Sequence, residues 1–419
     1  MELSRISIGS AVLFSFFLLS SLLIPLVFGS SLMWSQTYGG PDQEIAHWLV
    51  ETSDGGYAIG GYTRDFGAPE GDDDFLLVKI DANGKMEWNQ TYEMTEIDRV
   101  RSMIITSDGG YVIVGGHWLV KVDLNGNMEW NQTFGGTDAH SVVEIPDGGY
   151  VIAGRTGYSD EYKDDFLLIK TDSHGNLEWN RTYGGTGSDN ANSVIVTFDG
   201  GFALAGSTWS FNSSSPDFWL IKTDANGNMV WNQTYDYDKW WESANFVFET
   251  AGGGYVIAGV AAFPPPLPVY YFWVIKTDAY GNMEWNKTYG ESEYEQANSV
   301  VLTSDGGFAI SGSKQFFDHG YHHDFWLIKT DANGNEEWSQ TYGGTDNEIP
   351  HSLIETSDGG YALAGESYPK FWAGDSDFWI VKTDEQGIIP EFSSWIMLPL
   401  LLVSALVVVG IRNKIKRNG

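Results

Sequence analysis

The sequence predicts an all-β fold built from seven copies of one unit, and three observations support that prediction. A tryptophan recurs at intervals of 42 to 54 residues. Between successive tryptophans lie a DGGY-like turn and a segment that reads DFWLIKTDANGN or close to it. The recurring tryptophans are Trp34, Trp88, Trp130, Trp179, Trp231, Trp285 and Trp338. A period of this length indicates that one unit cannot bury its own apolar face and must stack on its copies.

Each unit is expected to form four short antiparallel strands. In the sixth unit, residues 297–304 are a β-branched, apolar run, and Asp305-Gly306-Gly307 breaks it with residues that favour turns. Residues 308–313 would form the return strand. Residues 324–331 alternate and run into an Asn-Gly hairpin turn, and residues 336–342 form the last strand. Seven such units describe a seven-bladed β-propeller.

The ends of the repeat region predict how the ring closes. The first element, Leu32–Tyr38, is an orphan last strand, and the seventh unit stops at Gly387 after three strands. The orphan strand would therefore complete the seventh blade, and residues 31–388 would form a closed, monomeric propeller. The recurring tryptophans are expected to pack between neighbouring blades as core, rather than to dock a cofactor.

The two ends of the chain predict its location. Residues 1–29 hold Arg5 and then an apolar stretch with a small residue at its end, typical of a signal peptide or an uncleaved N-terminal anchor. Residues 395–411 are apolar and precede a basic tail at residues 412–419, which predicts a transmembrane helix with a cytoplasmic tail. Residues 389–394 would be a linker. The propeller is therefore expected to be extracellular and anchored in the membrane at the cell surface.

Composition restricts the partners. The formal net charge is −33, which repels nucleic acid and excludes it as a partner. The chain has no cysteine, so disulfide and thiolate chemistry are excluded.

The repeat itself resembles a known family. The string NMEWNQTYGG…DGGYVIAG…DFWLIKTDANGN is similar to the β-propeller repeats of exported archaeal and bacterial surface proteins, including SBBP repeats, over nearly all of residues 32–387. Pro390-Glu391-Phe392 also resembles archaeal PEF-type C-terminal sorting signals. That resemblance implies cleavage by an archaeosortase, with a plain anchor as the alternative. The family implies a surface interaction or structural module, and no catalytic residues come with it.

Sequence motifs for catalysis are missing. The chain has no GxSxG, HExxH or P-loop motif, and no GxGxxG that opens a helix. Asp331-Ala332-Asn333-Gly334 superficially resembles a calcium loop, but its glycine comes two positions too early for an EF-hand. A hairpin turn explains it better because a close variant recurs in every unit. The sequence therefore predicts no catalytic residue, no cofactor and no metal site.

One polar residue from each unit falls where the innermost strand begins, when the units are aligned on the DGG turn. These residues are His47, Arg101, His140, Asn192, Asn245, Asn298 and His351. They are expected to surround one mouth of the central channel. The candidate binding residues among them are His47, Arg101, His140 and His351. The simpler interpretation is that each one satisfies backbone groups between adjacent blades.

The loops between the second and third strands vary, and variable loops on a rigid scaffold are common binding sites. One carries His319, His322 and His323, which would be either a metal site or part of a solvated loop.

The second unit has almost no such loop, whereas its neighbours have long ones. This difference predicts a notch near Arg101, bordered by Phe66 and by the candidate binding residues Tyr158 and Tyr162. A harmless deletion during repeat duplication is the alternative.

Six sequons are candidate glycosylation sites: Asn89, Asn131, Asn180, Asn212, Asn232 and Asn286. Five of them directly follow a recurring tryptophan, so repeat duplication explains their pattern without sugar.

The sequence thus favours a membrane-anchored surface propeller that binds a protein or glycan and is not an enzyme. Two alternatives stay open. One is an extracellular enzyme acting on glycans through carboxylates at the channel mouth, and the other is a purely structural component of the envelope.

Overall fold

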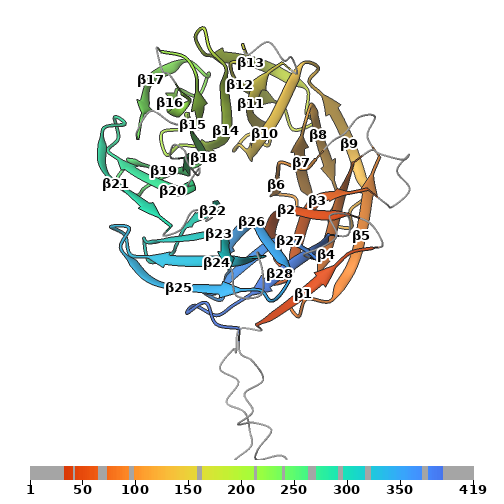
Figure 1. Ribbon diagram of the computed structural model, residues 1–419. Helices are drawn as coiled ribbons and strands as arrows, with labels where there is room; N and C mark the ends of the chain where they lie inside the picture. Colours follow the sequence, from red (N-terminus) through yellow and green to blue (C-terminus); the bar gives the residue numbers. More distant parts are fainter. Residues whose placement is uncertain are drawn as a thin grey trace, which may run out of the picture. The chain divides into compact units, whose positions relative to one another are not determined.

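Seven antiparallel sheets of four strands each follow one another around a ring, so the chain is a seven-bladed β-propeller (Figure 1). The computed structural model describes residues 33–40, 43–64, 73–93, 99–157, 163–211, 215–237, 241–262, 270–290, 296–316, 322–369 and 376–389. Within these ranges there is no helix, which confirms the all-β prediction.

The strands fall into seven blades in chain order. The first three blades are β2 (Glu44–Glu51), β3 (Tyr57–Thr63), β4 (Asp74–Ile80) and β5 (Met86–Tyr92); β6 (Ser102–Ile105), β7 (Tyr111–Gly115), β8 (Trp118–Val122) and β9 (Met128–Thr133); and β10 (Thr137–Glu144), β11 (Tyr150–Thr156), β12 (Phe166–Thr171) and β13 (Leu177–Tyr183). The fourth and fifth are β14 (Asp189–Val196), β15 (Phe202–Thr208), β16 (Asp217–Thr223) and β17 (Met229–Tyr235); and β18 (Glu242–Glu249), β19 (Tyr255–Ala262), β20 (Tyr270–Thr277) and β21 (Met283–Tyr289). The sixth is β22 (Gln296–Leu302), β23 (Phe308–Phe316), β24 (His322–Thr330) and β25 (Glu336–Tyr342), and the seventh is β26 (Asn347–Glu355), β27 (Tyr361–Tyr368) and β28 (Asp377–Lys382) with β1 (Trp34–Tyr38).

The first strand of each blade lies nearest the centre of the ring, and the fourth lies at the rim (Figure 1). The two middle strands are covered on both faces by neighbouring blades, and β3 and β4 are buried at every position. That burial explains why the second and third strands are mostly apolar, whereas the fourth strand, with residues such as Met-Glu-Trp-Asn-Gln, is largely exposed.

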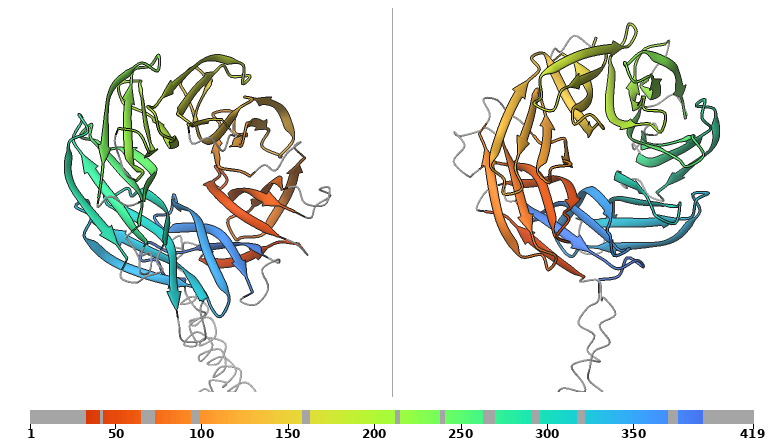
Figure 2. Two further views of the ribbon diagram at one scale, coloured as in Figure 1. Left: turned by 45° about the horizontal axis from the view of Figure 1, so that its top comes forward. Right: turned by 180° about the vertical axis from the view of Figure 1, so that it is seen from behind.

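The ring closes as the sequence predicts. Strand β1 pairs with β28 in antiparallel register, from Trp34 opposite Lys382 to Tyr38 opposite Phe378. The red strand β1 lies beside the blue strand β28 in the views of Figure 2. The first and last parts of the propeller therefore share one sheet.

The recurring tryptophans do pack between blades. The Trp34 indole Nε1 donates to the backbone oxygen of Ala82 at 3.0 Å, and its ring lies edge-on to Tyr57, with centroids 6.0 Å apart. The Tyr38 hydroxyl donates to the oxygen of Gly84 in the same turn. Equivalent tyrosines bind the turn of the next blade at five more interfaces: Tyr92, Tyr183, Tyr235, Tyr289 and Tyr342. Each indole is nevertheless only partly buried, because it lies near the rim.

The longest hairpin corrects one expectation about the loops. Strands β23 and β24 continue their pairing to Phe316 opposite His322, so His322 and His323 belong to a strand and not to a variable loop. Consecutive residues of a strand point to opposite faces, so the two imidazoles diverge. His322 stacks on Phe316, whereas His323 is paired with Gln315. His319 lies outside the described residues.

The predictions for the chain ends concern residues that are not described. The signal peptide or anchor at 1–29, most of the linker at 389–394, the helix at 395–411 and the tail at 412–419 all lie outside the described ranges. Within those ranges, no helix has the length and hydrophobicity needed to cross a membrane.

Candidate functional site at the channel mouth

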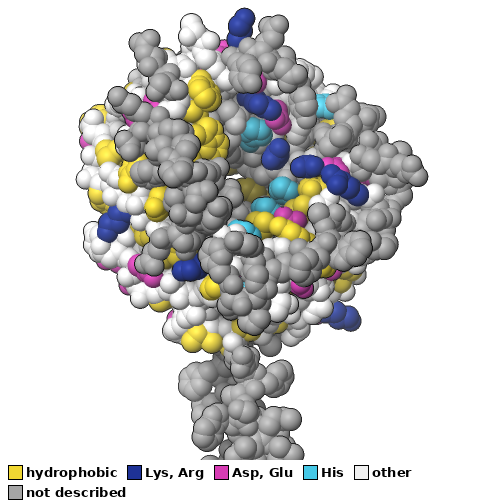
Figure 3. Space-filling view, viewed as in Figure 1, with side chains coloured by type: hydrophobic (Ala, Val, Ile, Leu, Met, Phe, Trp, Pro, Cys, Tyr) yellow, Lys and Arg dark blue, Asp and Glu magenta, His cyan; other side chains and the backbone are white. Residues whose placement is uncertain are grey.

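The seven polar residues aligned by the repeat line a single cavity of about 490 Å³ at the centre of the ring. Figure 3 shows histidine side chains, together with arginine or lysine, gathered around this central hollow. The alignment thus identified residues from seven blades that meet in space.

A β-bulge places most of these residues. The register between β2 and β3 skips His47, which lies between the paired residues Ala46 and Trp48. The same skip occurs at His140, Asn192, Asn245, Asn298 and His351. A bulge inserts one unpaired residue and re-aims its side chain. In these six blades the first strand therefore delivers one polar side chain to the channel without breaking the sheet.

A glycine on the second strand makes room for the bulge in five blades, and blade two has the same close approach without a bulge. A Cβ at Gly154 in β11 would lie 2.0 Å from the backbone oxygen of Asp138 in β10, which is far inside van der Waals contact. Glycines at five equivalent positions show the same approach at 1.9 to 2.1 Å: Gly61, Gly115, Gly206, Gly259 and Gly365. This strand-interior glycine is the sequence signal of the bulge.

Arg155 and His140 hold the buried carboxylate of Asp138 at one side of the cavity. Arg155 Nε and Nη2 lie 3.1 and 2.9 Å from Asp138 Oδ2, and His140 Nε2 lies 3.2 Å from the same atom. His140 Nδ1 lies 3.1 Å from the oxygen of Ala191 in the next blade. Burial alone would raise the pKa of Asp138, but the hydrogen bond from His140 and the charges of His140, Arg155 and Arg101 lower it to about 2. Both nitrogens of His140 are therefore engaged.

Arg101 and His47 are the groups best placed to meet a ligand. The Arg101 side chain is exposed, and no ion pair of its guanidinium occurs among the residues that the structure describes. His47 stacks on His351, with centroids 5.1 Å apart and planes 11° from parallel. Burial, and then the charges of His351, Arg101 and Arg99, lower the pKa of His47 well below its usual value. His47 is therefore neutral near pH 7 and keeps a nitrogen lone pair.

The other side of the cavity is lined by amides from β14, β18 and β22. Asn192 Nδ2 donates to Ala244 O at 2.8 Å, and Asn298 Nδ2 donates to Pro350 O at 2.6 Å. These bonds between blades, like that of His140 to Ala191, agree with the simpler interpretation of the ring as a set of seam contacts. They fix the side chains without filling the cavity.

An apolar cavity of about 450 Å³ adjoins the polar one. The inner strands of all seven blades line it with aliphatic side chains such as Val50, Val143 and Ile354. The two cavities share Trp48, Ser141, Ser193 and Phe246 as lining residues. Trp48 and Phe246 stand where the other five blades have serine, so the border carries aromatic rings on blades one and five.

The sequence analysis did not predict several residues that line the cavity. Asp138 and Asn190 lie two positions before a residue of the ring, so the two-residue period of a strand could have revealed them. Arg155 comes from the second strand, and only the pairing of β10 with β11 brings it near. Conversely, Phe66, Tyr158 and Tyr162, which were expected to border a notch, lie outside the described residues. The short connection of the second blade is present, with Gly115 paired to Trp118.

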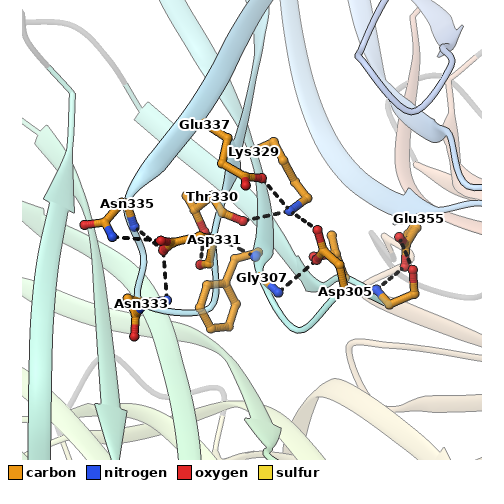
Figure 4. Close-up of polar contacts among 12 residues, drawn as sticks. Asp305, Gly307, Lys329, Thr330, Asp331, Asn333, Asn335, Glu337 and Glu355 are labelled. Atoms are coloured by element: carbon orange, nitrogen blue, oxygen red, sulfur yellow. Dashed lines mark hydrogen bonds and ion pairs between the residues drawn. The ribbon is translucent and has the colours of Figure 1, made fainter.

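The segment that superficially resembles a calcium loop is a hairpin turn, as expected (Figure 4). Asp331 Oδ1 accepts hydrogen bonds from the backbone nitrogens of Asn333 and Asn335, both at 2.8 Å. Beside it, the buried Lys329 Nζ lies 2.7 Å from Asp305 Oδ2 and 3.1 Å from Glu337 Oε2. These carboxylates are committed to the blade itself.

One cluster of three acidic side chains has the spacing of a metal site. Oxygens of Asp217, Asp236 and Glu242 lie within 4.8 Å of one another, and no other such group occurs among the described residues. None of the three lines the channel cavity.

Five sequon asparagines are exposed on the outermost strands: Asn89, Asn131, Asn180, Asn232 and Asn286. Asn212 lies outside the described residues. Their glycosylation stays a prediction.

Comparisons with known proteins give two kinds of likeness. Residues 66–183 match the family model described as Arylsulfotransferase (ASST). The matched segment contains Arg101, Asp138, His140 and Arg155, and covers less than half of the chain. No curated protein matches the chain significantly.

Solved structures share the architecture. The WD40 domain of Neurospora crassa Pan2 matches with a TM-score of 0.52 and 12% identity, over 86% of this chain and 99% of that chain. A mutant of the Synechocystis apocarotenoid oxygenase matches with a TM-score of 0.51 and 10% identity, over 86% and 95%. Identities this low show the fold alone.

The expectation of a non-enzymatic protein is contradicted by the match to an enzyme family. A motif search cannot find residues that come from separate blades, because they form no contiguous motif. The repeat alignment brought seven lining residues of the cavity together. The partial match to the arylsulfotransferase model, together with the seven-bladed fold, is what the comparisons show for this chain.

Proposed function

We propose that the protein is a sulfuryl-transfer enzyme of the arylsulfotransferase type, with its reaction centre in the channel-mouth cavity. One observation carries the proposal: a cavity with imidazole and guanidinium groups adjoins an apolar cavity in a protein of net charge −33. An aryl sulfate has the matching parts, a compact anion joined to an apolar ring. The overall negative charge repels anions, so the arginine and histidine gathered in this one hollow would have to supply the local attraction for a sulfate.

The geometry gives each group a role. Arg101 is exposed in the cavity and would bind the sulfuryl oxygens, because a guanidinium matches an oxyanion through paired N–H donors. His47 would be the nucleophile, since its lowered pKa leaves a nitrogen lone pair at neutral pH. The aryl group would enter the apolar cavity past Trp48 and Phe246.

The reaction would proceed in two displacements. The His47 nitrogen attacks sulfur, an N–S bond forms, and the S–O bond to the aryl group breaks, so that the electron pair leaves with the aryloxide. The acceptor hydroxyl then attacks the same sulfur, and the N–S electron pair returns to the imidazole. The freed nitrogen takes the acceptor's proton and passes it to the solvent. His140, with both nitrogens engaged, would orient Asp138 and Arg155 rather than react.

The predicted membrane segment at residues 395–411 would hold the ring at the cell surface. Aryl sulfates are anions that do not cross membranes freely, so a surface enzyme would meet them directly.

The test is a transfer assay with the purified full-length chain, 4-methylumbelliferyl sulfate as donor and phenol as acceptor. We expect release of the fluorescent product to depend on acceptor, and His47→Ala to slow it on the order of 100-fold or more. Arg101→Ala should raise KM for the donor. His174→Ala, on an exposed turn far from the cavity, is the matched control. Undiminished turnover in His47→Ala would assign the chemistry to another group, and no turnover in the wild type would refute the proposal.

A further inference from the structure

The polar cavity is divided into two chemically different halves. Blades seven, one, two and three contribute ionisable side chains, namely His351, His47, Arg101 and His140. Blades four, five and six contribute only amides from the ring positions, namely Asn192, Asn245 and Asn298. Asn190 lies on the same side as these amides and also lines the cavity. We name these four asparagines the amide arc.

The amide arc is held in a fixed orientation that presents carbonyl oxygens. Asn192 and Asn298 commit their NH₂ groups to backbone oxygens of the next blade, at 2.8 and 2.6 Å. Asn190 Nδ2 donates to Asn192 Oδ1 at 2.9 Å, and Asn190 Oδ1 is buried with no hydrogen-bond partner. A buried amide oxygen without a partner is costly, so a ligand donor that displaces its neighbours and reaches it would be bound favourably.

Asn245 is the least constrained member of the arc. Its Oδ1 receives only two long contacts, each of 3.4 Å, from Asn192 Nδ2 and Ser243 Oγ. The next residue, Phe246, lines both cavities and adds an apolar surface beside the amides. The arc thus offers several uncharged acceptors next to an aromatic ring.

We infer that the amide arc binds a neutral saccharide, and that a sugar hydroxyl is the acceptor of the sulfuryl group. This inference rests on the proposed function and names its second substrate. A phenol carries one O–H donor and would leave most of these oxygens unmatched, whereas a sugar ring carries several donors and an apolar C–H face. A second anion would gain nothing from acceptor oxygens. The volume of about 490 Å³ lies within the range of small-ligand sites.

The transfer step is the second displacement with a sugar alcohol in place of a phenol. The sugar oxygen forms the new S–O bond, the N–S bond to His47 breaks, and the hydroxyl proton goes to the freed imidazole nitrogen. No further reactant is required.

The experiment compares two acceptors on the full-length chain with 4-methylumbelliferyl sulfate as donor. Chitotetraose in its fully N-acetylated, uncharged form and phenol are supplied separately, and the sulfated products are quantified by mass spectrometry. We expect the wild type to favour chitotetraose, and Asn245→Ala to lower the ratio of saccharide to phenol transfer about tenfold, the size of one lost hydrogen bond. Asn226→Ala, on an exposed hairpin turn, should leave that ratio unchanged.

Calorimetric titration with chitotetraose in the absence of donor separates this inference from the proposed function. Saccharide binding that weakens about tenfold in Asn245→Ala supports the amide arc as a sugar site, even if no sulfuryl transfer occurs. Transfer to phenol without binding or sulfation of chitotetraose overturns the inference and leaves the proposed function standing. An equal loss of both transfers in Asn245→Ala, at unchanged melting temperature, also overturns it.

Discussion

His47 and His351 stack face to face across the seam between the first and the last blade, with ring centroids 5.1 Å apart. The charge of His351 is one of the causes that lower the pKa of His47, after burial. The interface between the first and the last blade therefore contributes to the lowered pKa of the proposed nucleophile.

His351→Gln should raise the pKa of His47 towards its usual value. The substitution removes a positive charge that disfavours protonation of His47, whereas the burial of His47 remains. Imidazole titration by NMR measures the change directly. The proposed sulfuryl transfer requires neutral His47, so its rate should fall as the pH drops through the pKa of His47, and the acid limb of the pH–rate profile should move to higher pH in this variant. His174→Gln is the control, and an unmoved His47 titration in His351→Gln would contradict this coupling.

Deleting residues 32–38 should abolish cooperative unfolding of the propeller. The deletion leaves β28 as an open edge and removes the Trp34 and Tyr38 contacts to the turn of the first blade. Calorimetry should show a broadened transition or aggregation. Deletion of residues 395–419, which lie after the last blade, should instead leave a sharp transition. Equal stability of the two truncations would disprove closure by β1.

Gly154→Ala should destabilise the protein by about 1–3 kcal/mol, the usual cost of overpacking a tight site. The new Cβ would meet the oxygen of Asp138 at 2.0 Å and push β10 outward. Because His140 stands in the adjoining bulge, donor binding should weaken as well. Gly135→Ala is the matched control, since nothing lies within 4 Å of its Cβ position. Chemical denaturation measures the free energy of unfolding of both variants. Equal stability of Gly154→Ala and Gly135→Ala would show that the bulge moves aside without cost and would contradict the prediction.

Glu348→Gln should stabilise the protein at pH 8 and have little effect at pH 4. Burial and the nearby charge of Asp324 raise the pKa of Glu348 to about 7. Between the two pKa values, the Glu348 carboxyl therefore keeps its proton in the folded state. In the unfolded state it loses that proton once the pH exceeds its ordinary pKa of 4.5. The stability that this proton supplies is complete at low pH and is lost as the pH rises through 7. Melting temperatures of the wild type and Glu348→Gln between pH 4 and pH 8 test this prediction. A stabilisation that is equal at pH 4 and pH 8 would refute the raised pKa of Glu348.

Gly252→Asp should stabilise the fifth blade by about 1 kcal/mol. In the sixth blade the equivalent Asp305 accepts bonds from Thr303, Gly307 and Lys329 at 2.6 to 2.9 Å. The corresponding Lys276 has only Glu284 as an ion-pair partner among the described residues, and its side chain is 27% exposed, compared with 6% for Lys329.

Space is available at this position, because the nearest atom to a Cβ at Gly252 is 4.0 Å away. Gly252→Asn separates the two contributions, since it restores the turn hydrogen bonds without the charge. Aspartate and asparagine variants of equal stability would assign the whole gain to the turn.

The sequence predicts the ring well because each repeated signal has a local cause. The Asn-Gly turns require glycine at positive φ, as at Gly334, and the tryptophans mark the blade interfaces. The closure of the ring by β1 and the ring of seven polar residues both follow from aligning the repeats and counting their strands. These features depend on neighbours in sequence or on an identical copy one period away.

The proposed reaction centre is harder to predict because it depends on contacts between different strands. Arg155 reaches Asp138 only through the pairing of two strands, and the lowered pKa of His47 depends on blades one, two and seven together. The bulge could have been inferred from the glycine of the second strand. The strand positions of His322 and His323 could not, because a hairpin's length depends on the loop that ends it.

The pairing of β1 with β28 also determines how the ring responds to force. Trp34 and Lys382 are opposite each other, so the chain enters and leaves the propeller at the same end of one strand pair. A pull between the two ends would peel the strands apart one hydrogen bond at a time, rather than shear all of them at once. Traction would therefore detach β1 from the seventh blade first, while the other six sheets carry little of the load.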